Sequence, residues 1–530
     1  MNKAKYSIIP KPQKYDLLDG TFVITSETEV LCYPEFMKAG KYISKFLRTK
    51  KEAKRGSIKF VKDDKIPSEG YKLKVTTEGV IISSSDVNGA FYGAVTLKIM
   101  IMQSKKASGV SELNCSYIYD YPKFSFRGGM MDESRHFFGV DAVKRALDEM
   151  AMLKLNKFHW HLSDDQGYRI ESEIYPLLNE IGSKRQYEFL GGAEVLSYLG
   201  MKKDGDEYFR FYKKDEIREI VDYASKLCID IIPEIGIPGH TVAMLAAYNN
   251  LSCKKENYEV FCENAITKDI LCVGQEETYE FIKNLLAEVC ELFPYEYFHI
   301  GGDEAFKGHK IWEKECPVCQ AKMKELGFTK GSELQTYFTN RINDYLKTLG
   351  KKCIVWNDGI DDNTSNDVVG QYWISRSALW VKNECKKRKY IVSTCPTLYF
   401  DYNFSKSSLK KVYNFNVVKS GFVNENRVLG IEFESWSEWI VNEKVWQFAV
   451  YPRIYAMSEV AWTEDNKKNF KDFYRRLNFF KAYMRAKNIN YSRIEKKKLF
   501  VSNRSVFHLG HWGNEYKYNE KIKEKEGKEK

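Results

Sequence analysis

Between residues 126 and 432 the sequence alternates short apolar runs with longer amphipathic segments, and it does so eight times. The amphipathic segment over 141–155 places Val143, Leu147 and Met150 on one face at helical spacing. Eight successive strand–helix units predict an α/β fold, a closed (β/α)8 TIM barrel rather than an open doubly wound sheet. We find no Gly-x-Gly-x-x-Gly turn after a strand, which disfavours a dinucleotide-binding sheet. The predicted strands are Phe126–Asp132, Lys157–Leu162, Ile229–Ile235, Tyr297–Gly302, Cys353–Asn357, Gly370–Ile374, Tyr390–Thr394 and Val428–Glu432.

A smaller unit precedes the predicted barrel. Strand-like runs between residues 21 and 84, followed by a helical pattern over Asn88–Met102, predict a small α+β domain over residues 1–120. Tyr121-Pro122 marks its end, and the barrel is expected over residues 121–490. Residues 491–530 are expected to form a C-terminal extension. Its last eight residues contain only Lys, Glu and Gly, a composition typical of a disordered tail.

Charge and cysteine content restrict the classes of partner. The formal net charge is +11, from 83 Lys and Arg against 72 Asp and Glu, but the two signs are interspersed, so we expect no nucleic-acid partner. No run of about 18 apolar residues predicts a membrane span, and Met1–Tyr6 lacks the apolar core of a signal peptide. The 12 Cys are scattered, and the Cys-x-x-Cys pair Cys316 and Cys319 has no second pair at zinc spacing. We therefore expect a reduced, metal-free cytoplasmic protein; whether it forms a homodimer is left open.

Polar and aromatic side chains gather where the predicted strands end, which is where a barrel enzyme builds its site. For any one of them, a satisfied polar group at a strand end is the simpler interpretation. Five of the eight histidines fall at this one face, however, and the set as a whole favours a functional site. The candidates are Asp132, Arg135, His136, His159, His161, Asp164, Asp165, Glu234, His240, His299, Asp303, Glu304, Trp356, Asp358, Trp373, Trp436 and Glu438.

Asp303 and Glu304 carry the most chemistry. Adjacent strand residues point to opposite sides, so both carboxylates reach one site only where the strand is ending. Gly301 and Gly302 precede them and permit that bend. Two neighbouring carboxylates repel, which raises the pKa of one and lets it act as an acid near neutral pH. Protonation of a glycosidic oxygen requires such an acid.

His159 and His161 are two residues apart on a predicted strand and therefore share one face. Such a pair could begin a metal site of the amidohydrolase type, but the segment after the third strand adds only His240. The ligand count therefore disfavours metal catalysis, and we expect no catalytic metal and no cofactor. His240 is predicted instead to hydrogen-bond Asp164 or Asp165 and hold it in place.

Seven motifs, taken in order along the chain, resemble those of family 20 glycoside hydrolases. The resemblance spans residues 5 to 485. The N-terminal Ile8-Ile-Pro-Lys-Pro12 also resembles that family's α+β domain. The motifs are Phe126-Arg-Gly-Gly-Met-Met-Asp132 with Ser134-Arg-His-Phe137, Phe158-His-Trp-His-Leu-Ser-Asp-Asp-Gln-Gly-Tyr-Arg169 with Tyr175-Pro176, Pro233-Glu-Ile-Gly-Ile-Pro-Gly-His240, His299-Ile-Gly-Gly-Asp-Glu304, Tyr399-Phe-Asp401, Trp436-Ser-Glu438, and Pro452-Arg453 through Glu459-Val-Ala-Trp462.

The resemblance implies an exo-acting β-N-acetylhexosaminidase that releases terminal β-linked GlcNAc or GalNAc with retention, through an oxazolinium formed by the substrate's own acetamide. It implies that Glu304 is the general acid and base, that Asp303 orients the acetamide, and that Tyr399 hydrogen-bonds its carbonyl. The implied substrate-binding residues are Trp356, Trp373 and Trp436 around the acetamide, Arg127, Asp401 and Glu438 on the ring hydroxyls, and Asp164, Asp165 and His240 in support.

Some positions depart from the family pattern. Gly236 replaces a usual acidic residue, and Glu432, Glu434 and Ser435 replace an amide-rich stretch. No Trp lies between Asp401 and Trp436, where Phe404 or Phe415 is a candidate substitute. These departures leave open a disaccharide-releasing or sulfated-sugar-specific enzyme. An inactive sugar-binding protein is disfavoured by the intact Asp303, Glu304 and Tyr399.

Overall fold

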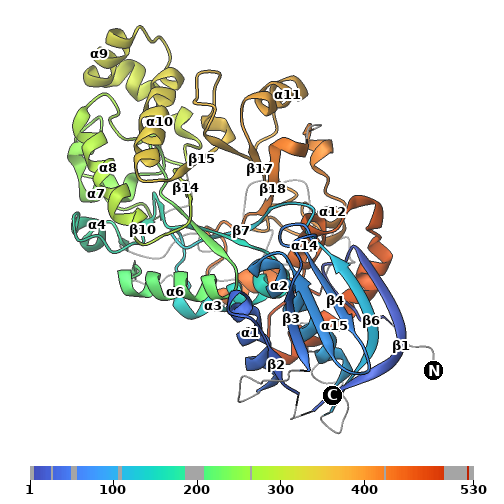
Figure 1. Cartoon of the computed structure of the whole chain (residues 1–530). Coiled ribbons are helices and arrows are strands. Elements are labelled where there is room, and N and C mark those ends of the chain that lie inside the picture. Colours follow the sequence, from blue (N-terminus) through green and yellow to red (C-terminus); the bar gives the residue numbers. More distant parts are fainter. Residues whose placement is uncertain are drawn as a thin grey trace.

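A closed barrel of parallel strands forms the centre of the computed structural model, which describes residues 5–25, 28–48, 57–105, 110–185, 208–262, 266–422, 425–493 and 522–524 (Figure 1). Each strand pairs with its neighbours in chain order, and β18 closes the barrel on β7 through pairs such as Ile431 with Arg127. The predicted (β/α)8 fold is confirmed. The barrel strands are β7 (Phe126–Asp132), β8 (Lys157–His161), β13 (Asp230–Glu234), β14 (Tyr297–His299), β15 (Lys352–Trp356), β16 (Val369–Tyr372), β17 (Tyr390–Val392) and β18 (Val428–Phe433).

Amphipathic helices cover the outside of the barrel. In α3 the side chains of Val143, Leu147 and Met150 are buried, as the helical spacing predicts. Each fully buried apolar side chain of this size contributes about 1.5–3 kcal/mol relative to an exposed one. The α-helices from α3 on are α3 (Val140–Met152), α4 (Leu177–Glu180), α6 (Lys214–Lys226), α7 (Val242–Ala247), α8 (Glu276–Cys290), α9 (Pro317–Leu326), α10 (Gly331–Thr348), α11 (Ala378–Lys387), α12 (Leu409–Tyr413), α13 (Glu443–Val450), α14 (Arg453–Trp462) and α15 (Phe470–Ala486).

A six-stranded mixed sheet precedes the barrel and lies beside its C-terminal helices (Figure 1). Its long strand β6, which has a polar sequence and was not predicted, largely alternates buried and half-buried side chains. Helix α2 packs on the sheet and buries most of its side chains, in agreement with the predicted helix over Asn88–Met102. The strand order is β1 (Lys14–Ile24), β6 (Ser111–Asp120), β4 (Tyr71–Val75), β5 (Val80–Ser84), β3 (Ile58–Lys62) and β2 (Val30–Leu31), with helices α1 (Met37–Leu47) and α2 (Val87–Ser104).

Buried charges join this sheet to the barrel. Lys154, directly after α3, donates from Nζ to Asp120 Oδ2 over 2.8 Å and to the Tyr71 hydroxyl over 2.9 Å. Both members of the Lys154–Asp120 ion pair have fully buried side chains. The Lys154 ammonium also lies 4.5 Å from the centre of the Trp462 ring. Because a buried charge is costly without its partner, each half of this interface depends on the other.

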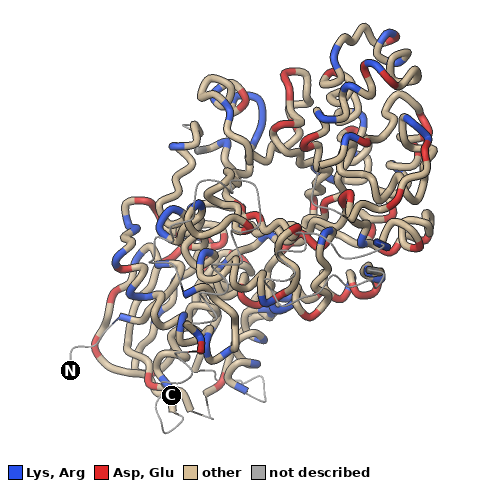
Figure 2. Tube along the Cα trace, turned by 180° about the vertical axis from the view of Figure 1, so that it is seen from behind, with Lys and Arg blue, Asp and Glu red and all other residues tan. Residues whose placement is uncertain are grey.

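Charges of both signs alternate along the described trace, without a single basic stripe (Figure 2). No helix among the described residues is long and apolar enough to cross a membrane. Most of the predicted C-terminal extension, including residues 494–521 and 525–530, lies outside the described residues.

Candidate active site

The backbone around Glu304 has an unusual conformation. Gly301, Gly302 and Glu304 all have positive φ angles, of 69°, 88° and 53°. Glycine adopts such angles freely, whereas a residue with a Cβ does so at a cost that tends to be found at functional sites. The Glu304 amide donates to Asp358 Oδ2 over 2.7 Å and is thereby fixed. The bend predicted for the two glycines is present, and it turns the chain at the carboxyl end of β14.

The Asp303 and Glu304 side chains share His240 as a neighbour. Nε2 of His240 lies 3.7 Å from Asp303 Oδ2 and 3.6 Å from Glu304 Oε2. The two carboxylate side chains keep 19% and 20% of their surface exposed, so a ligand can reach them. Burial raises the pKa of Asp303, while the His240 imidazolium opposes that rise and nearby Asp358 adds to it.

The predicted hydrogen bond from His240 to Asp164 or Asp165 is present in the structure, and Asp164 is the partner. Nδ1 of His240 lies 3.1 Å from Asp164 Oδ1 and 3.5 Å from Asp165 Oδ2. Burial lowers the pKa of His240, but the carboxylates of Asp164 and Asp303 outweigh that effect and raise the pKa well above its usual range. A cation is therefore held directly beside the Asp303–Glu304 pair.

Below these residues, the barrel interior is filled by a network around Glu234. This fully buried carboxylate accepts a 2.8 Å hydrogen bond from Trp356 Nε1 and contacts Nδ1 of His161 at 2.5 Å. His159 and His299 lie 3.0 and 3.2 Å from it. Because Trp356 is almost fully buried, it forms the floor of the site rather than an exposed wall.

Three aromatic side chains stand above that floor. Trp373 stacks on Tyr399 with ring centres 6.1 Å apart, and its indole N–H donates to Asp358 Oδ1 over 2.8 Å. Tyr399 lies 6.5 Å from Trp436, which is 5.8 Å from Trp356. The structure therefore brings together the three tryptophans and the tyrosine that the family resemblance assigned to the acetamide.

These contacts close into a ring around the mouth of the barrel. We call it the mouth ring. In order around the barrel it consists of Glu304, Asp358, Trp373, Tyr399, Trp436, Arg135, Asp164 and His240, which returns to Glu304.

The position of Arg127 contradicts its predicted role on the sugar. It is the second residue of β7, at the amino end of the barrel, and it is fully buried. Its guanidinium pairs with Glu69 at 2.8 Å and donates to the Tyr92 hydroxyl at 3.0 Å. Arg127 therefore joins the barrel to the N-terminal sheet, because only residues at the carboxyl end of a strand reach the site.

Arg135, a strand-end candidate that the family resemblance did not assign to the sugar, lies in the mouth ring instead. It follows the end of β7, pairs with Asp164 at 2.7 Å, and lies 3.9 Å from Glu438 and 5.3 Å from the Trp436 ring. The signal for it was its position in Ser134-Arg135-His136, just beyond a strand end.

Asp401 has one buried carboxylate oxygen without a hydrogen-bond partner among the described residues. Such an atom is costly unless a ligand satisfies it.

A metal held by His159 and His161 is the alternative that the ligand count disfavoured. In the structure, both histidines instead contact buried carboxylates. Nδ1 of His159 binds Glu432 Oε1 at 2.8 Å, and Gln371 Nε2 donates to both Glu432 and Glu434, at 2.6 and 3.0 Å. Burial lowers the pKa of His159, but the carboxylates outweigh it and raise the pKa to about 10. Nε2 of the same ring lies 3.0 Å from Glu234 Oε2, so both ring nitrogens of His159 face carboxylates.

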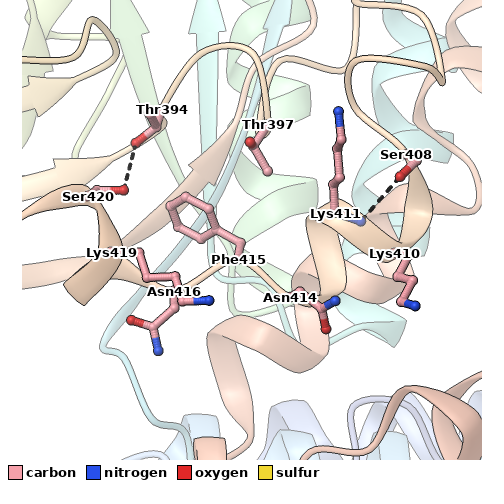
Figure 3. Close-up of a pocket in the computed structure, with 10 residues that line it drawn as sticks. All are labelled: Thr394, Thr397, Ser408, Lys410, Lys411, Asn414, Phe415, Asn416, Lys419 and Ser420. Carbon is pink, nitrogen blue, oxygen red and sulfur yellow. Dashed lines mark hydrogen bonds between the residues drawn. The ribbon is translucent and has the colours of Figure 1, made fainter.

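A separate cavity of about 440 Å³ lies beside the loop that follows β17 (Figure 3). No carboxylate and no residue of the mouth ring lines it, so it is not where the predicted chemistry occurs. Phe415 lines this cavity, and the centre of the Phe404 ring lies 4.2 Å from Cζ of Arg453 in the core. Neither side chain therefore replaces the missing tryptophan as a wall of the sugar pocket. The lining residues are Thr394, Thr397, Ser408, Lys410, Lys411, Asn414, Phe415, Asn416, Lys419 and Ser420.

Paired carboxylates at the carboxyl end of a (β/α)8 barrel, surrounded by indole rings, define a glycoside hydrolase. The chain belongs to glycosyl hydrolase family 20, since the model of that family's catalytic domain matches residues 124–465 and the model of its domain 2 matches residues 5–121.

Named relatives agree with this membership. A beta-hexosaminidase of Porphyromonas gingivalis is 31% identical over 92% of this chain, which spans 64% of that relative's length. The structure of an exo beta-N-acetylglucosaminidase of Vibrio harveyi, in complex with N-acetylglucosamine, matches with a TM-score of 0.82 and 28% identity, over 93% of this chain and 79% of that one. A beta-N-acetylhexosaminidase structure from Bacteroides fragilis matches with a TM-score of 0.79 and 29% identity, over 91% and 96% of the two chains.

Proposed function

We propose that this chain is an exo-acting β-N-acetylhexosaminidase that removes terminal β-linked N-acetylhexosamine from glycans and uses the substrate's acetamide as its nucleophile. The observation that carries the proposal is the mouth ring, because it joins Glu304, one member of the accessible carboxylate pair, to an aromatic enclosure suited to an acetamide. Aromatic faces pack on the apolar face of a sugar and on a methyl group.

The proposed reaction has two steps. Glu304 first donates its proton to the glycosidic oxygen while the acetamide oxygen attacks the anomeric carbon and the glycosidic bond breaks, which leaves an oxazolinium. Asp303 accepts a hydrogen bond from the acetamide N–H, and Tyr399 donates one to the acetamide oxygen. Glu304, now ionised, then takes a proton from the water that attacks the anomeric carbon and opens the oxazolinium ring. Two successive displacements at that carbon retain the configuration. We assign the ring hydroxyls to Asp401, Glu438 and, in place of Arg127, Arg135.

The proposal is tested by release of para-nitrophenol from the N-acetyl-β-glucosaminide, the N-acetyl-β-galactosaminide and the plain β-glucoside. Hydrolysis of the acetamido sugars alone is expected, because the glucoside carries no nucleophile. Equal hydrolysis of the glucoside would contradict acetamide participation. Absence of hydrolysis with all three substrates would favour a disaccharide-specific enzyme or a sugar-binding protein, and a glycan array would distinguish those two.

Replacing Tyr399 with Phe is expected to lower kcat by about 10²-fold, as for loss of one hydrogen bond to a developing charge. The KM should change much less, because that bond strengthens only as the acetamide oxygen becomes a nucleophile. Steady-state kinetics with the acetamido substrate measure both parameters. Tyr402→Phe is the matched control, since the Tyr402 ring lies 6.2 Å from that of Tyr399 and has no assigned role. A change confined to KM would contradict the role of Tyr399.

Replacing His240 with Gln is expected to move the acidic limb of the kcat/KM profile to higher pH by about 1–3 units, the usual effect of one close charge. Asp303 acts as an ionised acceptor, burial raises its pKa, and the His240 cation 3.7 Å away counteracts that rise. Without the cation the pKa of Asp303 rises further, so activity is lost first at low pH. A uniform loss with an unmoved limb would restrict His240 to positioning.

We also infer that the chain works in a reducing compartment, the cytoplasm. All twelve cysteines are free thiols, and this many unpaired thiols is typical of reducing conditions. Cell fractionation followed by detection of the native protein tests this location.

A further inference from the structure

We propose that Cys253, Cys272, Cys316 and Cys319 bind a structural zinc ion as a tetrahedral four-thiolate site. We expected no second cysteine pair for Cys316 and Cys319 from the spacing along the chain. That expectation is wrong for the folded structure, because Cys253 and Cys272, from a segment distant in the sequence, lie against them. This inference concerns the fold of two loops and does not depend on the proposed function.

The distances between the sulfur atoms carry the proposal. Sγ of Cys272 lies 3.7 Å from Sγ of Cys316 and 3.7 Å from that of Cys319, and Cys253 lies 3.8 Å from Cys319. All four sulfur atoms lie within 4.8 Å of one another. A tetrahedron with Zn–S bonds of about 2.3 Å has edges of about 3.8 Å. The four sulfur atoms therefore have nearly the spacing that such an ion imposes.

The same distances disfavour two disulfides. A disulfide holds its sulfur atoms about 2.05 Å apart and pairs each cysteine with one partner. Here Cys272 is equally close to Cys316 and Cys319, and all four thiols are free. Four buried or half-buried thiols in mutual contact are more simply explained by a shared ion than by packing.

The local backbone presents the four thiols from two directions. Cys316 caps α9 and Cys319 lies in its first turn, with Pro317 between them at the first helical position. The partial positive charge at a helix N-terminus favours thiolates there. On the other side, an antiparallel bridge between Ser252 and Leu271 joins the two segments that carry Cys253 and Cys272, whose sulfur atoms lie within 4.8 Å of each other.

Gly274 lets these two halves approach. A Cβ at this position would lie 2.7 Å from the Cα and 2.8 Å from the nitrogen of Cys319, closer than real atoms pack. Only glycine permits this approach of backbone to backbone. The loop is therefore shaped to bring Cys272 against the start of α9.

The site would tie together two segments that flank the mouth ring. Leu271, next to Cys272, donates from its amide to the Pro238 carbonyl over 3.1 Å, two residues before His240. Its own carbonyl accepts from Trp312 Nε1 over 2.9 Å, on the segment that follows Glu304. Zinc would therefore stabilise the loops that position His240 and Glu304, while the reaction itself needs no metal.

Metal analysis of the full chain, purified under reducing conditions without added metal or chelator, tests the proposal. We expect about one zinc per chain by mass spectrometry of the elements, as for a structural four-cysteine site. Cys272→Ser and Cys316→Ser should each lower the zinc content at least tenfold. Cys290→Ser is the matched control, because Cys290 is a half-buried free thiol on α8 outside the cluster, and it should retain the metal. Wild-type protein with less than a tenth of one equivalent of zinc, or with iron in its place, would overturn the assignment.

Three measurements on the wild-type chain keep the test independent of whether a variant folds. An organomercurial reagent should release the zinc as the thiols react, and cobalt exchanged into the site should show the absorption of a tetrahedral thiolate complex. Alkylation of the denatured chain without reductant should modify all four cysteines. Peptides joined by disulfides among these four cysteines would refute the zinc site.

Discussion

Replacing Glu304 with Gln is expected to lower kcat by about 10²- to 10⁴-fold, because the amide can neither donate the proton to the glycosidic oxygen nor later accept one from water. Affinity for the sugar should survive, since Gln keeps the size and hydrogen-bonding capacity of the side chain. Steady-state kinetics measure the first effect, and calorimetric titration with N-acetylglucosamine measures the second.

The leaving group separates this role from a general loss of structure. A dinitrophenyl glycoside releases an anion that needs no proton, so Glu304→Gln should slow its hydrolysis far less than that of an alkyl glycoside. Glu315→Gln is the matched control, because Glu315 is exposed on the segment that follows Glu304. Wild-type turnover in Glu304→Gln on both substrates would refute the acid assignment.

Replacing Lys154 with Met is expected to lower the free energy of unfolding by about 3–5 kcal/mol, the usual cost of removing one partner of a buried ion pair. Met has a similar length, so the main loss is the compensation of the buried Asp120 carboxylate. Asp120 keeps a 2.8 Å hydrogen bond from the Trp462 indole, which limits the loss but does not replace the cation. The midpoint of urea unfolding measures the change.

Two further variants test whether this cost arises from the buried charge. Adding Asp120→Asn to Lys154→Met should recover part of the lost stability, since it removes the unpaired carboxylate. Lys144→Met breaks an exposed ion pair with Glu219 and should cost at most about 1 kcal/mol. Equal effects of Lys144→Met and Lys154→Met would contradict the role given to burial.

The barrel was predictable because its pattern is local. Every predicted barrel strand overlaps an observed strand, since an apolar run between two amphipathic helices has few alternatives. The strand ends then placed Asp303, Trp373 and Trp436 near one another without any distance information, and the family resemblance added Tyr399. Strand β6 was missed because its polar residues give a weak apolar signal, although its alternation is clear once its neighbours are known.

What the sequence did not predict depends on contacts between distant segments. Arg127 and Arg135 lie eight residues apart, and the role of each depends on which end of β7 it occupies. Arg127 also depends on its ion pair with Glu69, which is far away in the chain. The four cysteines are likewise divided between two loops, so spacing along the chain could identify only the pair at the start of α9. Partners separated by this much sequence are fixed by tertiary packing, which periodicity does not report.

The left-handed backbone of Glu304 sets activity against stability. Folding alone would place glycine at a position with a φ of 53°, because a side chain there costs about 1–2 kcal/mol. If Glu304 is the acid that we propose, selection for turnover keeps a carboxylate there and accepts that loss. Screens that select thermostability alone would then favour replacement of Glu304 and would enrich more stable chains without the proposed acid.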